Sequence, residues 1–134
     1  MEIYTSYYAK TKQLIENGII PVSISLYQPR WFKGHKIVSL APTKAMLDYN
    51  KEKYIEEYSK ILALLDVNKL REDIKMISRI SQYADVALLC YEKPGEFCHR
   101  RLFADWLKEK YGYEIKEFGI TPQNNIRAVQ TSMF

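Results

Sequence analysis

Residues 84–91 have the sequence ADVALLCY, a short and mostly apolar run. Such a run is typical of a strand that is buried on both faces, as in a parallel sheet. A turn-forming segment over 92–96 follows, then a predicted helix over 97–111 that ends at Gly112, then a predicted strand over 113–120. Strand, helix and strand joined by short loops predict a parallel βαβ unit.

The rest of the chain continues this alternation of strands and helices. Further strands are predicted over residues 2–7 and 19–26, and further helices over 9–16, after Asn50 and after Asp66. Asn50 and Asp66 are N-cap residues that precede apolar stripes with helical spacing. Pro21 has no N–H for a ladder hydrogen bond, so we expect it at the start of its strand. Residues 27–50 show no period and are expected to form a long connecting region.

These elements predict one compact α/β domain over residues 1–120 and a C-terminal tail over 121–134. We expect a mainly parallel sheet flanked by helices, in a Rossmann-like three-layer arrangement. With 134 residues, 47% of them apolar and 27% charged, the composition is that of a globular domain and disfavours disorder. No stretch approaches the roughly 20 apolar residues that span a bilayer, and no basic stretch followed by an apolar run resembles a secretory signal. We therefore expect a cytoplasmic protein without a membrane partner, and its two cysteines to be reduced.

The most specific motif follows the buried strand and places Cys98, His99, Arg100 and Arg101 at the start of a predicted helix. Ligands of open α/β sheets bind at the carboxyl ends of strands, where helix N-termini supply free N–H groups and partial positive charge. We therefore expect a site for an anion, held by Arg100 and Arg101. The same field would favour the thiolate of Cys98, a candidate nucleophile. His99 is a candidate for proton transfer, with Glu92 as its partner.

Structural interpretations of these residues remain open. His99 shares a helix face with apolar residues and could be a packed core residue, and Arg101 has the spacing of a helical ion pair with Asp105. Cys90 lies within the apolar strand and is expected to be a core residue. A metal site would need His35 to reach the cysteines from a distant loop, and the cysteine spacing is not that of a zinc motif. No metal and no cofactor are therefore expected.

A set of short segments is similar to one known family. These segments are residues 3–8, 24–25, 31–34 and 40–42, and above all 87–92 with 97–100. They resemble the family called domain of unknown function 488, and the resemblance extends over nearly the whole chain. It implies a compact α/β fold with the Cys-His-Arg element at the active site, and it supports Glu92, Cys98, His99 and Arg100 as site residues. It implies no particular reaction.

A second motif, residues 28–36, interleaves aromatic rings with cations. Its candidate ligand contacts are Arg30, Trp31, Lys33 and His35. Aromatic faces stack on bases and cations hold phosphates, so the motif predicts contact with a nucleotide or single-stranded nucleic acid. If its strand is parallel to the buried one, this loop should lie at the same sheet edge as Cys98. In the alternative interpretation Trp31 and Phe32 pin the loop to the domain and the charges are solvated.

The last five residues form a third motif, in which Gln130, Met133 and Phe134 are the candidate partner contacts. The pentapeptide is similar to the peptide with which bacterial DNA-metabolism proteins bind the sliding clamp. An extended terminal peptide of this kind places an aromatic–aliphatic pair in an apolar pocket, and the glutamine adds a directional hydrogen bond. The sliding clamp is therefore a candidate partner.

Three functions remain open from the sequence. The first is an enzyme that acts on a phosphate-bearing small molecule or nucleic acid through the cysteine and histidine. The second is a non-catalytic DNA-metabolism module recruited to the clamp by its tail. The third is a structural protein in which the cluster is only core. The net charge of +4 permits an anionic ligand without demanding nucleic acid.

Overall fold

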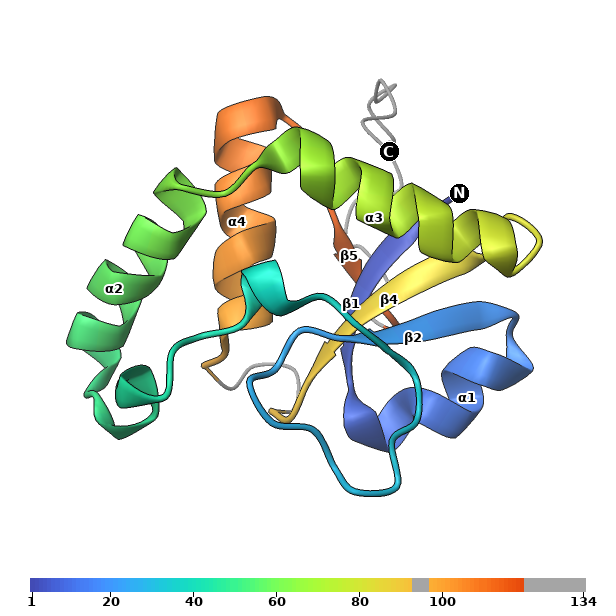
Figure 1. Cartoon of the computed structure of the whole chain (residues 1–134), viewed down its shortest axis with the longest axis horizontal. Coiled ribbons are helices and arrows are strands. Elements are labelled where there is room, and N and C mark those ends of the chain that lie inside the picture. The colour runs from blue at the N-terminus through green and yellow to red at the C-terminus, as the bar shows by residue number, and fades with distance from the viewer. Residues whose placement is uncertain (93–96, 120–134) are drawn as a thin grey trace.

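Five parallel strands form one sheet in the computed structural model, which describes residues 1–92 and 97–119. In sheet order the strands are β3 (His35–Lys36), β2 (Ile19–Ser23), β4 (Asp85–Cys90), β1 (Ile3–Tyr7) and β5 (Lys116–Glu117). The helices are α1 (Thr11–Glu16), α2 (Lys51–Ala63), α3 (Val67–Ile80) and α4 (His99–Tyr111), with short 3-10 helices η1 (Tyr8–Lys10), η2 (Val38–Leu40) and η3 (Ala45–Asp48) (Figure 1). The predicted α/β class with a parallel sheet is confirmed.

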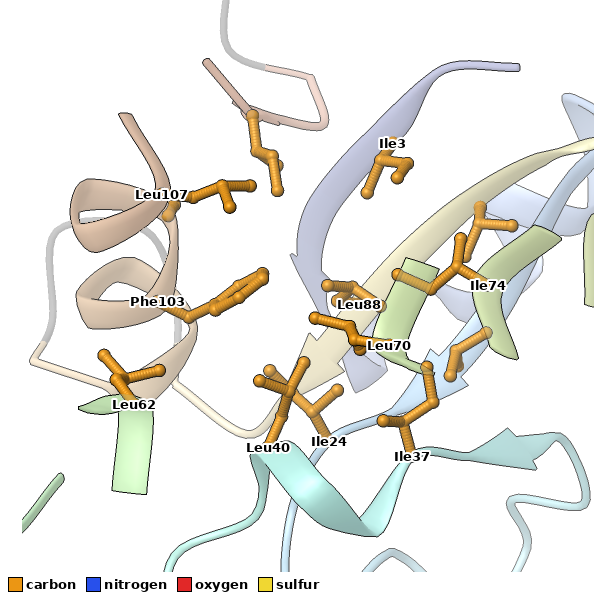
Figure 2. Packing of buried hydrophobic residues seen from close by; sticks show 14 of the residues in the cluster. Ile3, Ile24, Ile37, Leu40, Leu62, Leu70, Ile74, Leu88, Phe103 and Leu107 are labelled. Carbon is orange, nitrogen blue, oxygen red and sulfur yellow. The ribbon is translucent and has the colours of Figure 1, made fainter. Parts of the chain in front are cut away.

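The central strand β4 is buried on both faces, as its apolar sequence predicts. Val86 and Leu88 face a large core that they share with residues of α2, α3 and α4 (Figure 2). Ala87 and Leu89 face a smaller core on the opposite side, which α1 and the loop after β2 complete. Successive residues of a strand point to opposite faces, so helices must cover both sides of this sheet. This is the expected three-layer arrangement.

Pro21 lies in the middle of β2, not at its start as expected. The Ser23 carbonyl accepts from Ile37 on the β3 side, whereas the Ile24 N–H donates to Leu89 on the β4 side. By alternation, the nitrogen of Pro21 also faces the β3 side. Pairing with β3 begins only at Val22, so the missing N–H leaves no ladder bond unmade.

The helix ends follow the predicted caps. The Asn50 Oδ1 accepts from the Lys53 N–H at 2.9 Å and the Asp66 Oδ1 accepts from the Lys69 N–H at 3.1 Å. Gly112 closes α4 with a φ of +70°, a conformation that favours glycine. Among the described residues, no helix is both long enough and apolar enough to cross a membrane.

The long connection over residues 27–50 is ordered by its own buried side chains. Phe32 packs in the smaller core, while Ile37, Leu40 and Met46 pack in the larger one. It contains β3, η2 and η3, so this connection is folded where it passes the carboxyl end of the sheet. Its first residues after β2 contribute directly to the pocket described next.

Candidate active site

A pocket of about 340 Å³ lies where β2 and β4 end and α4 begins. Its chemically active residues are Cys90, Glu92, Cys98 and His99, and its flat walls are the rings of Tyr49, Tyr54, Tyr91 and Phe97. Ser25, Leu26, Tyr27, Pro42, Met46 and Leu47 complete the lining. We call this cavity the thiol pocket. It occupies the place where the topology of a parallel sheet predicts a ligand.

The two cysteines meet at this pocket from different elements. Cys90 is the last residue of β4, and Cys98 is the residue in extended conformation just before α4. The reactive atoms of Cys90, Cys98 and Glu92 all lie within 4.8 Å of one another. Both cysteines are free thiols and both are buried. The prediction that Cys90 is a buried strand residue is confirmed, but this position also makes it part of the site.

The surroundings of Cys98 favour its thiolate. A hydrogen bond from the Cys90 thiol lowers the pKa of Cys98 most, against the opposing effect of burial. The charge of Arg100 and the backbone N–H groups of Arg101 and Arg100 lower the pKa of Cys98 further. The same hydrogen bond, together with burial, raises the pKa of Cys90 well above its usual range. When one of the two thiols ionises, the negative charge therefore falls on Cys98 and Cys90 keeps its proton.

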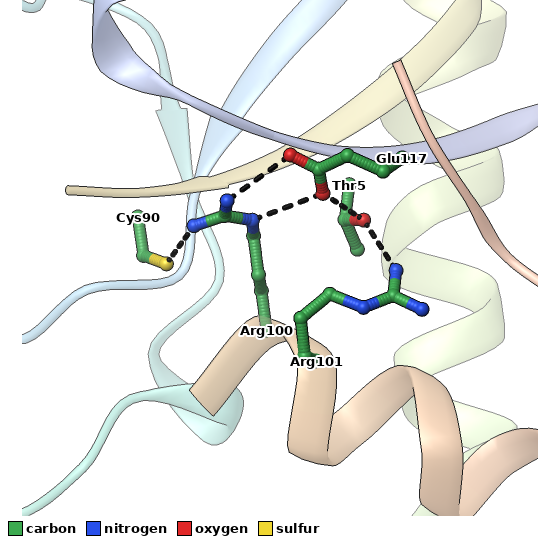
Figure 3. Close-up of polar contacts among 5 residues, drawn as sticks. All are labelled: Thr5, Cys90, Arg100, Arg101 and Glu117. Carbon is green, nitrogen blue, oxygen red and sulfur yellow. Dashed lines mark hydrogen bonds and ion pairs between the residues drawn. The ribbon is translucent and has the colours of Figure 1, made fainter. Parts of the chain in front are cut away.

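Arg100 is fully buried and its guanidinium is already bonded within the protein. Its Nε and Nη2 donate to the two carboxylate oxygens of Glu117 at 3.1 and 3.0 Å, a bidentate ion pair. Its Nη1 donates to the Cys90 Sγ at 2.8 Å (Figure 3). The pair with Glu117 fixes the guanidinium against the Cys90 sulfur, so Arg100 acts on the pocket through Cys90.

Arg101 points away from the thiols and extends the same network. Its Nη1 donates to the Thr5 Oγ1 at 3.0 Å, and Thr5 in turn donates to Glu117 at 2.6 Å (Figure 3). The predicted pairing of Arg101 with Asp105 is present at 3.9 Å. Arg101 does not line the thiol pocket. Among the described residues, its bond to Thr5, and through Thr5 to Glu117, connects α4 with β1 and β5.

His99 anchors the start of α4 to the end of β2. Its Nε2 lies 2.7 Å from the Ile24 carbonyl oxygen, which can only accept, so this nitrogen carries a proton. Burial lowers the pKa of His99 below its usual value, although the bond to Ile24 and the nearby Glu92 oppose that shift. His99 is therefore neutral at neutral pH, and any proton transfer by its ring would fall to Nδ1.

A thiophilic metal ion is the other species that two cysteines and a carboxylate could hold. The distances among Cys90, Glu92 and Cys98 would admit one. Arg100, however, already donates to the Cys90 sulfur, and its fixed positive charge opposes a second cation at the same atom. The arrangement therefore fits a thiol–thiolate pair better than a metal centre.

The four candidate contacts of the second motif lie elsewhere. Trp31, Lys33 and His35 line a separate groove of about 900 Å³ beside α1, which we call the aromatic groove, and Arg30 is exposed next to it. Phe32 pins the loop to the domain, whereas the Trp31 side chain is 59% exposed. The rings of Trp31, Tyr8 and Tyr91 contact one another in series, with centroids 6.5 and 4.8 Å apart, and Tyr91 also lines the thiol pocket. The loop thus adjoins the pocket without placing its cations in it.

Two groups of site residues were not predicted from the sequence. Glu117, the partner of Arg100, belongs to a two-residue edge strand and carries no local signal. Lys51 and Lys53 lie in the first turn of α2, where their ammonium groups stand 5.5 Å from the Phe97 ring and 4.1 Å from the Tyr49 ring, both walls of the pocket. Lysines at a helix N-terminus are unfavourable because the helix dipole is positive there. Two lysines at this position are therefore a feature of the sequence that could have indicated a functional role.

The predicted clamp contacts Gln130, Met133 and Phe134 lie outside the described residues, as does the proposed tail. Clamp binding stays a prediction.

The fold and the pocket define a class of protein: a small parallel α/β protein with two adjacent free cysteines at the carboxyl edge of its sheet. A family model described as "Active DUF488-N3 subclade" matches residues 12–111, and the chain belongs to the family of domain of unknown function 488. No curated protein and no solved structure gave a significant match.

Proposed function

We propose that this protein is a cysteine-dependent enzyme in which the Cys98 thiolate attacks a phosphate-bearing substrate with a flat aromatic part, such as a nucleotide. The observation that carries the proposal is the position of Cys98, at the start of α4 and beside Cys90 and Arg100 in a pocket that can admit a ligand. The matching family model is described as an active subclade, which agrees with a catalytic role.

The residues around Cys98 have complementary roles in this proposal. Cys98 supplies an electron pair to an electrophilic atom of the substrate, and the Cys90 thiol and Arg100 stabilise the thiolate before the attack. The Glu92 carboxyl lies within 4.8 Å of both sulfur atoms and is placed to exchange a proton with the leaving group. His99 and Glu117 act as positioning residues, because one fixes the start of α4 and the other fixes Arg100.

The walls and the rim indicate the substrate class. Tyr49, Tyr54 and Phe97 present flat rings, which suit stacking on a planar group such as a base. Lys51 and Lys53 stand over two of these rings without lining the pocket themselves, and their ammonium groups can bind a phosphate there. Arg100 is committed to Glu117, and the first-turn N–H groups of Arg100 and Arg101 act on Cys98, so these lysines are the better candidates to hold the anion.

Protection of Cys98 from alkylation tests both the pocket and the substrate class. A panel of nucleotides and the matching nucleosides is added to the reduced full-length protein, and the rate of iodoacetamide labelling of Cys98 is followed by mass spectrometry. We expect a nucleotide to slow labelling more than its nucleoside. Lys51→Ala and Lys53→Ala should remove that difference, while Lys69→Ala, on the exposed face of α3, should keep it. Equal labelling rates with and without every ligand would contradict the proposed substrate class.

A second candidate function is binding of single-stranded nucleic acid at the aromatic groove. The specific observation is the exposed Trp31 ring, with Lys12, Lys33 and His35 in the same groove. Exposed aromatic rings flanked by cations stack on successive bases and neutralise phosphates. Binding of a fluorescent DNA oligonucleotide at increasing salt tests it: affinity should fall as salt rises, and no binding at low salt would exclude this function.

A further inference from the structure

We propose that Cys90 and Cys98 form a peroxide-sensitive pair, in which oxidised Cys98 is captured by Cys90 as a disulfide that reversibly blocks the enzyme. This inference rests on the proposed role of Cys98 as the nucleophile and adds a form of regulation at the same site.

The geometry assigns the two cysteines different roles. Their sulfur atoms lie within 4.8 Å of each other, and both residues line the thiol pocket. Both cysteines are buried, but Cys98 keeps 4% exposure where Cys90 has none, and its lower pKa makes it the better nucleophile toward an oxidant in the pocket. A low-pKa cysteine that lines a pocket next to a second cysteine is the arrangement of redox-sensitive pairs. Cys98 is therefore the attacked residue and Cys90 the resolving one.

The chemistry takes place in two steps, with hydrogen peroxide as the oxidant. The Cys98 thiolate attacks one peroxide oxygen, the O–O bond breaks, and with one proton from solvent the products are Cys98 sulfenic acid and water. The Cys90 sulfur then attacks the sulfur of the sulfenic acid, an S–S bond forms, the S–O bond breaks, and the Cys90 proton leaves with the hydroxyl as a second water. The dithiol loses two electrons and the peroxide gains them.

Arg100 keeps the resolving cysteine in place. Its Nη1 donates to the Cys90 sulfur at 2.8 Å, and its bidentate pair with Glu117 fixes the guanidinium from the other side. A sulfenic acid formed on Cys98 therefore has a sulfur partner held beside it. A small dithiol such as dithiothreitol restores both thiols and is itself converted to its cyclic disulfide.

Disulfide mapping of the wild-type full-length protein is the direct test and needs no variant. The reduced protein is treated with an equimolar amount of hydrogen peroxide, remaining thiols are blocked, and the protein is digested without reductant for mass spectrometry. We expect the peptides of Cys90 and Cys98 to be joined and both thiols to be lost together. Dithiothreitol should restore both. Conversion of Cys98 to sulfinic acid while Cys90 stays free, or no loss of either thiol, would overturn the proposal.

Two variants separate this inference from the proposed function. Cys90→Ser should leave the sulfenic acid on Cys98 unresolved, so that dimedone traps it and excess peroxide carries it to sulfinic acid. Tyr54→Phe keeps the pocket wall and both sulfur atoms, and should form the disulfide as the wild type does. If Cys98 of the reduced protein has a lowered pKa but no disulfide forms, only the proposed regulation is wrong. If Cys98 has the pKa of an ordinary thiol, the proposed nucleophile is wrong as well.

Discussion

The thiol pocket and the aromatic groove both arise from short motifs that combine cations with reactive or aromatic residues, but the two motifs differ in how far their side chains are buried. At the thiol pocket the Cys90 sulfur accepts a hydrogen bond from Arg100, whose ion pair with Glu117 is buried. In the aromatic groove the side chains of Trp31, Lys33 and His35 are exposed, while the buried Phe32 ring and the pairing of β3 with β2 hold the loop to the domain.

This difference has a physical consequence. A buried charge is costly unless it is paired, so a network such as that of Arg100 constrains the fold as well as the chemistry. Exposed cations and rings cost little and can be changed without loss of the fold. Substitutions in the thiol pocket should therefore affect stability and reactivity together, whereas substitutions in the aromatic groove should affect binding alone.

The largest effect is expected from Arg100→Met. Loss of one partner leaves the Glu117 carboxylate buried without its counter-charge, which costs about 3–5 kcal/mol of the free energy of unfolding. Urea denaturation measures this. The matched change in the aromatic groove, Lys33→Met, should alter stability by no more than about 0.5 kcal/mol.

The double variant Arg100→Met with Glu117→Leu checks the cause of that loss. Because both charges are removed, it should recover much of the stability lost by Arg100→Met. If Arg100→Met alone proves as mild as Lys33→Met, the contrast between the buried network and the exposed groove is wrong.

A smaller effect is expected from Trp31→Ala, this time on binding. Removal of one stacking ring weakens binding of a single-stranded oligonucleotide by about 1–3 kcal/mol. Fluorescence anisotropy at low salt measures it, and urea denaturation should show little change in stability because the ring is largely exposed. Unchanged oligonucleotide affinity would show that the groove does not use this ring.

The smallest expected effect comes from His99, on stability at acidic pH. The pKa of His99 is lowered in the folded protein by burial, so below about pH 6.5 the unfolded chain binds a proton that the folded protein does not. His99 therefore contributes stability above that pH, which is lost as the pH falls. His99→Gln, which keeps a donor for the Ile24 carbonyl, should show a smaller loss between pH 7 and 5.

His35→Gln, in the exposed aromatic groove, is the matched control substitution for this pH series. Thermal unfolding at each pH provides the measurement. A pH profile of His99→Gln identical to that of the wild type would mean that His99 does not titrate differently in the fold.

The sequence predicted what depends on local pattern and missed what depends on pairing between distant elements. The apolar run at β4, the caps Asn50 and Asp66 and the helix end at Gly112 all carry local signals, and all were confirmed. Glu117 could not be paired with Arg100 from sequence, because its edge strand crosses β1 to lie beyond it.

The site predictions show the same limit. Arg100 was predicted to hold an external anion, but the structure gives it an internal one, the Glu117 carboxylate. The second motif was expected at the same sheet edge as Cys98, and the loop does follow β2 there. Its side chains turn toward α1 instead, because Phe32 packs beneath Tyr8 and Leu14 in the smaller core. Side-chain direction in a long connection depends on such tertiary contacts.

The alkylation rate of Cys98 as a function of pH tests the activated thiolate most directly. In the reduced protein we expect labelling of Cys98 to reach half of its maximal rate below about pH 8.5, the value of an ordinary thiol. Cys90→Ala, which removes the hydrogen-bond donor, should move that midpoint upward, and Cys90→Ser, which keeps a donor, should move it less. A wild-type midpoint at or above about pH 8.5 would contradict the assignment of Cys98 as an activated nucleophile.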